Sequence, residues 1–149
     1  MISIRKTSEV QVDFADILRH SPVAGAPNAM EYLQRFLDFS STTYIGYING
    51  EIACLYGLRP ATILSNSQTY LWLLTTDVID RNKFEFIRNS EIVIENILKE
   101  YERIVGDTHV KDIRAFKWLR WLGAIYLNTH PLVQFYITRE SFKARRAKR

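Results

Sequence analysis

The chain has 149 residues, of which 47% are hydrophobic and 24% charged, the balance of a folded domain rather than a disordered chain. Its one cysteine, Cys54, excludes an internal disulfide, and no stretch approaches the roughly 18 apolar residues that a membrane-spanning helix needs. The net charge is +4, but the last nine residues hold five basic side chains and no acid. We therefore predict a single domain over residues 1–140, near neutral in charge, and a basic tail over residues 141–149.

The first part of the chain predicts one strand and two helices. Residues Ile2–Lys6 alternate apolar and polar side chains, as a half-buried strand does. Apolar residues recur at helical spacing in Val12–His20 and again in Asn28–Phe39, where Asn28 stands as the expected N-cap. Two prolines and a glycine between the helices indicate a loop.

The middle of the chain predicts a β-hairpin and a central strand. Asn49 and Gly50 separate two alternating runs, Thr43–Ile48 and Glu51–Leu58, and these two residue types best tolerate the positive φ angles of a type I′ turn. Residues 59–68 have the composition of a turn region. Thr69–Thr75 is almost wholly apolar, which predicts a strand covered on both faces.

The remaining elements complete an α/β pattern. A long helix is expected at Asn82–Arg103, where Asn82 and Glu85 have the spacing of a capping box. Residues 104–110 form a short strand or extended link, Asp112–Ala124 a further helix, and residues 125–127 and 132–138 two last strands. The order β-α-α-β-β-β-α-β-α-β-β predicts a mixed, mostly antiparallel and twisted sheet with helices on both faces.

This order resembles the GNAT fold, the Gcn5-related N-acetyltransferase superfamily, over about residues 2–138. The resemblance is carried by Asn49-Gly50, the strand "YLWLLTT" and the helix "IRAFKWLRWLGA", in which Ala115 and Gly123 match the family's last-helix pattern. More narrowly, the chain is similar to small GNAT-like proteins of tailed bacteriophages, including internal virion proteins of short-tailed phages. They share a "WLLTT"-like strand, a long charged helix and a "RFLRWLGA"-like helix. That resemblance implies a GNAT-like scaffold with a role in the phage particle or in infection.

Two elements of an active GNAT enzyme are missing from the sequence. The phosphate loop of the family, Q/R-x-x-G-x-G/A, falls on "TTDVIDRNKF", which has no glycine and places Asp77 and Asp80 where an anion should bind. The family's proton-donating tyrosine falls on Leu119, and leucine cannot transfer a proton. Tyr126 and Tyr136 remain as substitute donors. The main interpretation is therefore a non-catalytic phage protein without a cofactor, which acts through protein contacts in virion assembly, the particle or infection.

The alternative is an acyl-CoA-dependent N-acyltransferase with an atypical phosphate loop and acetyl-CoA as cofactor. In that interpretation a strand backbone holds the pantetheine arm, and basic side chains replace the glycine loop. The cofactor-binding residues would be Leu73, Leu74, Thr75, Thr76, Arg81 and Lys83. The enzyme interpretation further predicts an open cleft beside Thr75 and Thr76 with unpaired N–H groups, whereas the protein-contact interpretation predicts a closed one.

A third, weaker interpretation is a nucleic-acid-binding module led by the basic tail, since clustered Lys and Arg side chains release counterions on binding phosphates. An exposed tryptophan can also anchor a protein interface. The candidate partner-binding residues are Trp118, Trp121, Lys143, Arg145, Arg146, Lys148 and Arg149. A further alternative assigns these residues no binding role. The tail would be a solvated, disordered end of the chain, and the basic stripe of the preceding helix would face water.

The cysteine and the histidines of the chain predict no further catalytic or metal site. Cys54 alternates with apolar residues and is expected in the core, and the three histidines lack metal-ligand spacing, so no metal site is predicted.

The N-terminus lacks the apolar core of a signal peptide. Expected partners are other phage or host proteins, DNA through the tail, or a second copy, but no membrane, in the host cytoplasm or the virion.

Overall fold

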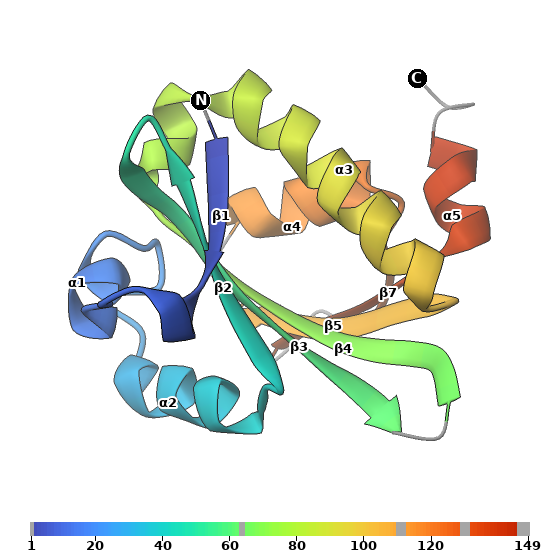
Figure 1. Cartoon of the computed structure of the whole chain (residues 1–149), viewed down its shortest axis with the longest axis horizontal. Helices are drawn as coiled ribbons and strands as arrows, with labels where there is room; N and C mark the ends of the chain where they lie inside the picture. The colour runs from blue at the N-terminus through green and yellow to red at the C-terminus, as the bar shows by residue number, and fades with distance from the viewer. Residues whose placement is uncertain (1, 63–64, 110–112, 129–131, 146–149) are drawn as a thin grey trace.

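The computed structural model describes residues 2–62, 65–109, 113–128 and 132–145 (Figure 1). The described strands are β1 (Ile2–Lys6), β2 (Thr42–Ile48), β3 (Glu51–Thr62), β4 (Ser65–Thr75), β5 (Arg103–His109), β6 (Ile125–Asn128) and β7 (Leu132–Thr138). The described α-helices are α1 (Phe14–Arg19), α2 (Ala29–Phe39), α3 (Lys83–Glu100), α4 (Ile113–Trp121) and α5 (Arg139–Ala144). Two 3₁₀ turns, η1 (Thr7–Glu9) and η2 (Asp77–Arg81), join them.

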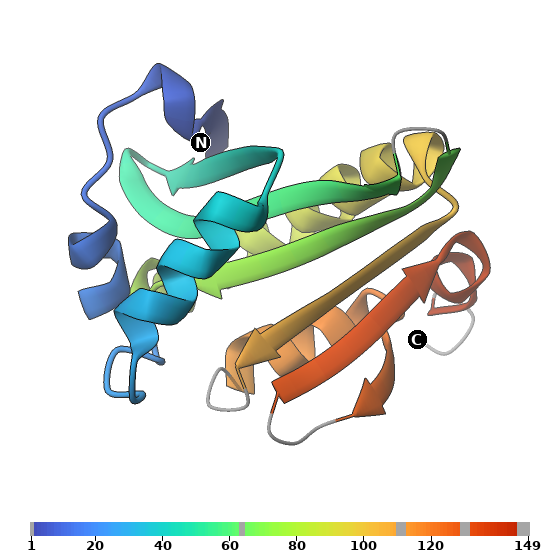
Figure 2. The same cartoon turned by 90° about the horizontal axis from the view of Figure 1, so that it is seen from below.

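The strands form one sheet in the order β1-β2-β3-β4-β5-β7-β6. Neighbouring strands run antiparallel except β4 and β5, which are parallel. Helices α1 and α2 cover one face of the sheet, and α3 and α4 cover the other (Figures 1 and 2). The predicted fold class, a mixed and mostly antiparallel sheet between helices, is confirmed.

Two apolar clusters, one on each face of the sheet, form the core. Alternation along β4 explains the division: Leu71 and Leu73 pack towards α3, whereas Trp72 and Leu74 pack towards α1 and α2. Trp72 is 2% exposed and stacks on Phe36 of α2, with ring centroids 5.6 Å apart. The central position predicted for this strand follows directly from these two sets of contacts.

The hairpin prediction is confirmed, but the next turn is shorter than its composition suggests. Asn49 and Gly50 have φ angles of 52° and 82°. Strand β3 continues beyond Leu58 to Thr62, and β4 starts already at Ser65, so most of the turn region predicted at residues 59–68 is paired strand. Pairing between two long strands outweighs local turn propensity, and the irregular register after Pro60 accommodates the proline.

The predicted helix caps are wrong in detail. Asn82 does not cap α3; its side-chain amide instead donates to the carbonyl oxygen of Val78, 3.0 Å away. The helix ends at Glu100, because Arg103 already belongs to β5. Asn28 precedes α2 as expected but has φ 56° and makes no side-chain cap. In both places the preceding turn, which capping-box spacing does not register, sets the asparagine conformation.

The C-terminal region contains a helix that composition did not predict. Thr138 and Ser141 form a reciprocal capping box that starts α5 at Arg139. Phe142 is 7% exposed and Arg145 6% exposed, so both side chains are buried against the body. Helix α5 therefore crosses the predicted boundary at residue 140, and residues 146–149 lie outside the described part of the chain.

Candidate functional site

The sheet opens between its two parallel strands. The pairing of β4 with β5 runs from Gln68↔Arg103 to Trp72↔Asp107, whereas β4 itself continues to Thr75. Beyond Asp107, strand β5 stays paired with β7. Figure 2 shows the lime-green β4 and the gold β5 adjacent at one end and apart at their arrowheads. The end of β4 is thus released from the strand that pairs with its first half.

A pocket of about 60 Å³ lies at this opening, on the side of α1 and α2. Leu73, Leu74, Asp107 and Thr108 line it from the two separating strands. Its other walls are apolar and aromatic, and its remaining lining residues are Leu18, Val23, Ala26, Ala29, Tyr32, Leu33, Phe36 and Trp72. A mostly apolar pocket with a few polar groups is the usual form of a small-molecule site.

Among the described lining residues of this pocket, Asp107 carries a carboxylate, and Tyr32 and Thr108 carry hydroxyls. The Tyr70 hydroxyl donates to Oδ2 of Asp107 at 2.5 Å. Burial raises the pKa of Tyr70, and the hydrogen bond and negative charge of Asp107 raise that pKa further. The Thr108 side chain is 4% exposed, and its hydroxyl has no hydrogen-bond partner. Strand alternation turns the Thr108 side chain to the face of the sheet opposite to Asp107, so its unpartnered hydroxyl is a costly group within the core.

Replacing Thr108 by valine should therefore stabilise the chain. Valine has nearly the same shape and removes the unsatisfied hydroxyl, so the free energy of unfolding should rise by about 1 kcal/mol. Urea denaturation measures the change, with Thr7→Val as the control because the Thr7 hydroxyl is hydrogen-bonded to Thr43. A less stable Thr108→Val variant would mean that the hydroxyl is satisfied in the folded protein.

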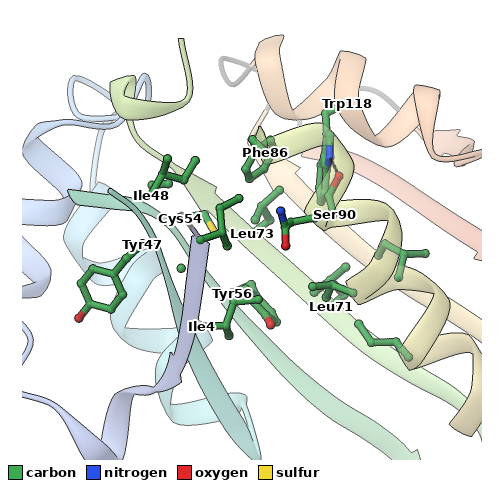
Figure 3. Close-up of a pocket in the computed structure, with 17 residues that line it drawn as sticks. Ile4, Tyr47, Ile48, Cys54, Tyr56, Leu71, Leu73, Phe86, Ser90 and Trp118 are labelled. Atoms are coloured by element: carbon green, nitrogen blue, oxygen red, sulfur yellow. Dashed lines mark hydrogen bonds between the residues drawn. The ribbon is translucent and has the colours of Figure 1, made fainter. Parts of the chain in front are cut away.

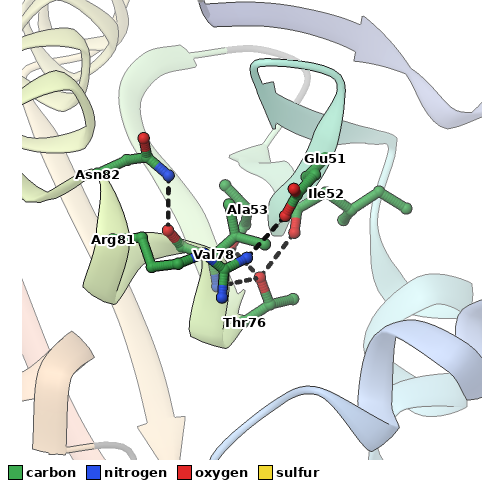
Figure 4. A network of polar contacts seen from close by, with 7 residues as sticks. All are labelled: Glu51, Ile52, Ala53, Thr76, Val78, Arg81 and Asn82. Atoms are coloured by element: carbon green, nitrogen blue, oxygen red, sulfur yellow. Dashed lines mark hydrogen bonds and ion pairs between the residues drawn. The ribbon is translucent and has the colours of Figure 1, made fainter.

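The turn after β4 is bonded to its own chain. The Thr76 N–H donates to the Ala53 carbonyl oxygen at 2.9 Å, and the Asp77 N–H donates to the His20 carbonyl oxygen at 3.0 Å. The Thr76 hydroxyl donates to the Ile52 carbonyl oxygen and accepts from the Val78 N–H (Figure 4). The expectation of an unpaired N–H at Thr76 is wrong, and these groups do not form a pyrophosphate cradle.

The first turn of α3 offers a different anion site. The helix begins at Lys83 without a side-chain cap from Asn82, and the positive end of its dipole lies at this exposed first turn, which also carries Glu85. Arg81 is paired with Glu51 at 2.7 Å, but both side chains are more than half exposed, so this ion pair is weak (Figure 4). The Asp80 carboxylate forms an ion pair with Arg114 at 2.7 Å, so its negative charge repels a nearby anion less.

The two tyrosines predicted as substitute proton donors, Tyr126 and Tyr136, do not line the pocket, and neither does Leu119. Leu119 is completely buried. The Tyr126 hydroxyl donates to the Phe116 carbonyl oxygen, and burial raises the pKa of Tyr126 to about 12. Tyr136 lies against the guanidinium of Arg103. Neither tyrosine lines the pocket between β4 and β5.

The predicted partner residues divide between internal contacts and the surface. The Trp118 indole N–H donates to Ser90 at 2.6 Å, and its ring packs on Phe86. Trp121 is partly buried beside Arg145, which forms an ion pair with Glu91. Lys143 is exposed on α5. The other three, Arg146, Lys148 and Arg149, lie outside the described residues, so a role in partner binding stays a prediction.

Cys54 lies in the core, as expected for a small apolar residue. It is 8% exposed beneath α3 and lines an apolar pocket of about 50 Å³ (Figure 3). Burial raises its pKa to about 12, which suppresses the nucleophilic thiolate. Within the described residues no three His, Cys, Asp or Glu side chains gather as metal ligands, and no described helix has the length and apolarity to span a membrane.

No protein-family model matches this chain, and no curated protein does so either. Solved structures do match. Aminoglycoside acetyltransferase AAC(6')-Ib in complex with coenzyme A and kanamycin is 19% identical, with 98% of this chain and 99% of that chain covered at a TM-score of 0.66. The fold is that of the GNAT acetyltransferases.

Two further solved structures have the same fold. A GNAT family acetyltransferase from Elizabethkingia anophelis with acetyl-CoA bound is 13% identical, with 92% of this chain and 97% of that chain covered at a TM-score of 0.63. Campylobacter jejuni N-acetyltransferase PseH in complex with acetyl coenzyme A is 9% identical, with 93% and 99% covered at a TM-score of 0.54.

These neighbours correct the main functional prediction. They are acetyltransferases with coenzyme A or acetyl-CoA bound, so the interpretation as a non-catalytic phage protein is wrong. Nothing links the chain to internal virion proteins, and the expectation of no cofactor has no support. The prediction of a non-catalytic protein fails because it rests only on the absence of the family's glycine loop and tyrosine. The predicted partners and the predicted location stay predictions.

Proposed function

We propose that the chain is an acyl-CoA-dependent N-acyltransferase. The observation that carries the proposal is the opening of the sheet between β4 and β5, with Asp107 and Thr108 beside a pocket at the point of separation. The GNAT fold of the chain and the coenzyme A in its structural neighbours support the same function.

The released end of β4 fits the pantetheine arm of acyl-CoA. Leu73 and Leu74 line the opening and lie beyond the last residue of β4 that pairs with β5. The pyrophosphate does not fit the turn at residues 76–79, where N–H groups are already bonded, but the first turn of α3 with Arg81 and Lys83 fits an anion. Bound there, acyl-CoA supplies an acyl group activated as a thioester.

The residues of the pocket have distinct tasks in acyl transfer to an amine. Asp107 is the only charged side chain among the described residues that line the pocket, so it binds the ammonium form and accepts the proton that the amine must lose. The apolar walls from α1 and α2 exclude water, which would otherwise compete for the thioester.

Acetyl-CoA binding tests the proposal by isothermal titration calorimetry. The intact chain should bind in the micromolar range, and an Arg81→Ala, Lys83→Ala double variant should bind about tenfold more weakly or less, because each charge-assisted contact contributes roughly 1.5–3 kcal/mol. An Arg5→Ala, Lys6→Ala variant loses the same charge on exposed residues of β1 and should bind like the intact chain. No heat at millimolar acetyl-CoA would refute the proposed function.

A further inference from the structure

The charge of the pocket between β4 and β5 restricts which amine can enter. Asp107 is half-buried, and the described lining carries no second charged side chain. One oxygen of Asp107 accepts from Tyr70, but a carboxylate has about four lone-pair sites, so it can also accept from an ammonium group. A second ammonium inside the pocket would find no second carboxylate among the described lining residues, and an unpaired buried charge is expensive.

The volume of the pocket restricts the size of the carbon skeleton of that amine. Its volume of about 60 Å³ is well below the roughly 150 Å³ of a cavity that binds benzene. Leu33 is 4% exposed and Trp72 2% exposed, and the stack of Phe36 on Trp72 holds this wall in place. Packed side chains of this kind do not yield to a bulkier group without strain.

We infer that the acceptor of this pocket is a primary amine with one positive charge on a short, unbranched alkyl chain. The ammonium group would bind the Asp107 carboxylate, and the alkyl chain would lie against the apolar wall. The inference rests on the proposed function for its acyl-transfer step, but not for binding. The same two restrictions disfavour amines whose second charge must enter the pocket.

Four small probes with matched size test the charge and shape requirements by calorimetry, with and without saturating coenzyme A. n-Butylamine should bind about tenfold or more tightly than 1,4-diaminobutane, which adds one charge, and than tert-butylamine, which is branched. 1-Butanol, which lacks the charge, should bind about as weakly. Equal or tighter binding of 1,4-diaminobutane or tert-butylamine would overturn the inference.

Substitution of Asp107 tests the site itself. Asp107→Asn keeps an acceptor for Tyr70 but removes the charge, and should weaken n-butylamine binding about tenfold while leaving 1-butanol binding unchanged. Asp38→Asn, an exposed carboxylate of α2 outside the pocket lining, is the matched control and should bind n-butylamine normally. Unaltered n-butylamine binding in Asp107→Asn would overturn the inference, provided that circular dichroism shows both variants folded.

Failure of the inference and failure of the proposed function have different signatures. Release of free coenzyme A thiol from acetyl-CoA, measured with each amine, reports acyl transfer. Selective n-butylamine binding through Asp107 without acetyl-CoA binding would refute the proposed function and leave the inference standing. Acetyl-CoA binding, with acyl transfer to 1,4-diaminobutane or tert-butylamine as fast as to n-butylamine, would support the proposed function and overturn the inference.

Discussion

Replacement of Gly106 by alanine is expected to lower the free energy of unfolding by about 3 kcal/mol or to prevent folding, the upper end of what overpacking costs. A Cβ at this position would lie far inside van der Waals contact of the Leu71 carbonyl oxygen and 3.0 Å from the ring of Phe135. Leu71 is the register partner of Gly106 across the β4–β5 pair. Because the obstructing atom is backbone, no side-chain rotation can relieve the clash.

Urea denaturation measures this loss, and Gly25→Ala is its control. A Cβ at Gly25 would meet nothing within 4 Å, so this variant should differ from the intact chain by less than about 0.5 kcal/mol. If Gly106→Ala folds, its β5 must move away from β4 immediately before Asp107, and n-butylamine binding should weaken as well. A variant with unchanged stability would mean that the two strands do not approach each other as closely as this structure has them.

The sequence predicts the fold well where one pattern extends over many residues. The alternating strands around Asn49-Gly50 and the apolar run of β4 leave little ambiguity about the element type, because period and turn chemistry agree. Prediction fails where pairing decides. Pro60 and its neighbours have turn composition, yet β4 lies alongside them and keeps them extended. The sequence does not predict helix α5, because five basic residues among the last nine indicate a tail. The signal for the helix is the capping box of Thr138 and Ser141 at its start.

The candidate site was harder to predict than the fold. Asp107 and Thr108 belong to a segment that the sequence described only as a short strand or link. Only the parallel pairing of β4 with β5 shows that Asp107 stands opposite Trp72, at the last paired position. One feature of the sequence pointed to it: Asp107 is the single acidic residue of "IVGDTHV". The absence of a phosphate loop at this turn agrees with its lack of glycine, but the bond of the Thr76 N–H to Ala53 of the neighbouring strand could not be predicted from the sequence.

Replacement of Arg145 by alanine is the second change with a large expected effect, a loss of about 3 kcal/mol in the free energy of unfolding, as for other broken buried ion pairs. The Arg145 side chain is 4% exposed and Glu91 25% exposed, and their ion pair joins the end of α5 to α3. The guanidinium also donates to the Phe142 carbonyl oxygen and lies 3.6 Å from the centre of the Phe142 ring. Its removal leaves Glu91 without this cation.

Lys143→Ala provides the matched control in the same urea titration. It removes the same charge from an exposed position of α5, so its free energy of unfolding should stay within about 0.5 kcal/mol of the intact chain. A double-mutant cycle with Glu91→Ala should give a coupling energy above about 1 kcal/mol for Arg145 and Glu91. If Arg145→Ala were as stable as Lys143→Ala, α5 would not be anchored by this pair. The predicted basic tail over residues 141–149 would then describe this segment better than an anchored helix.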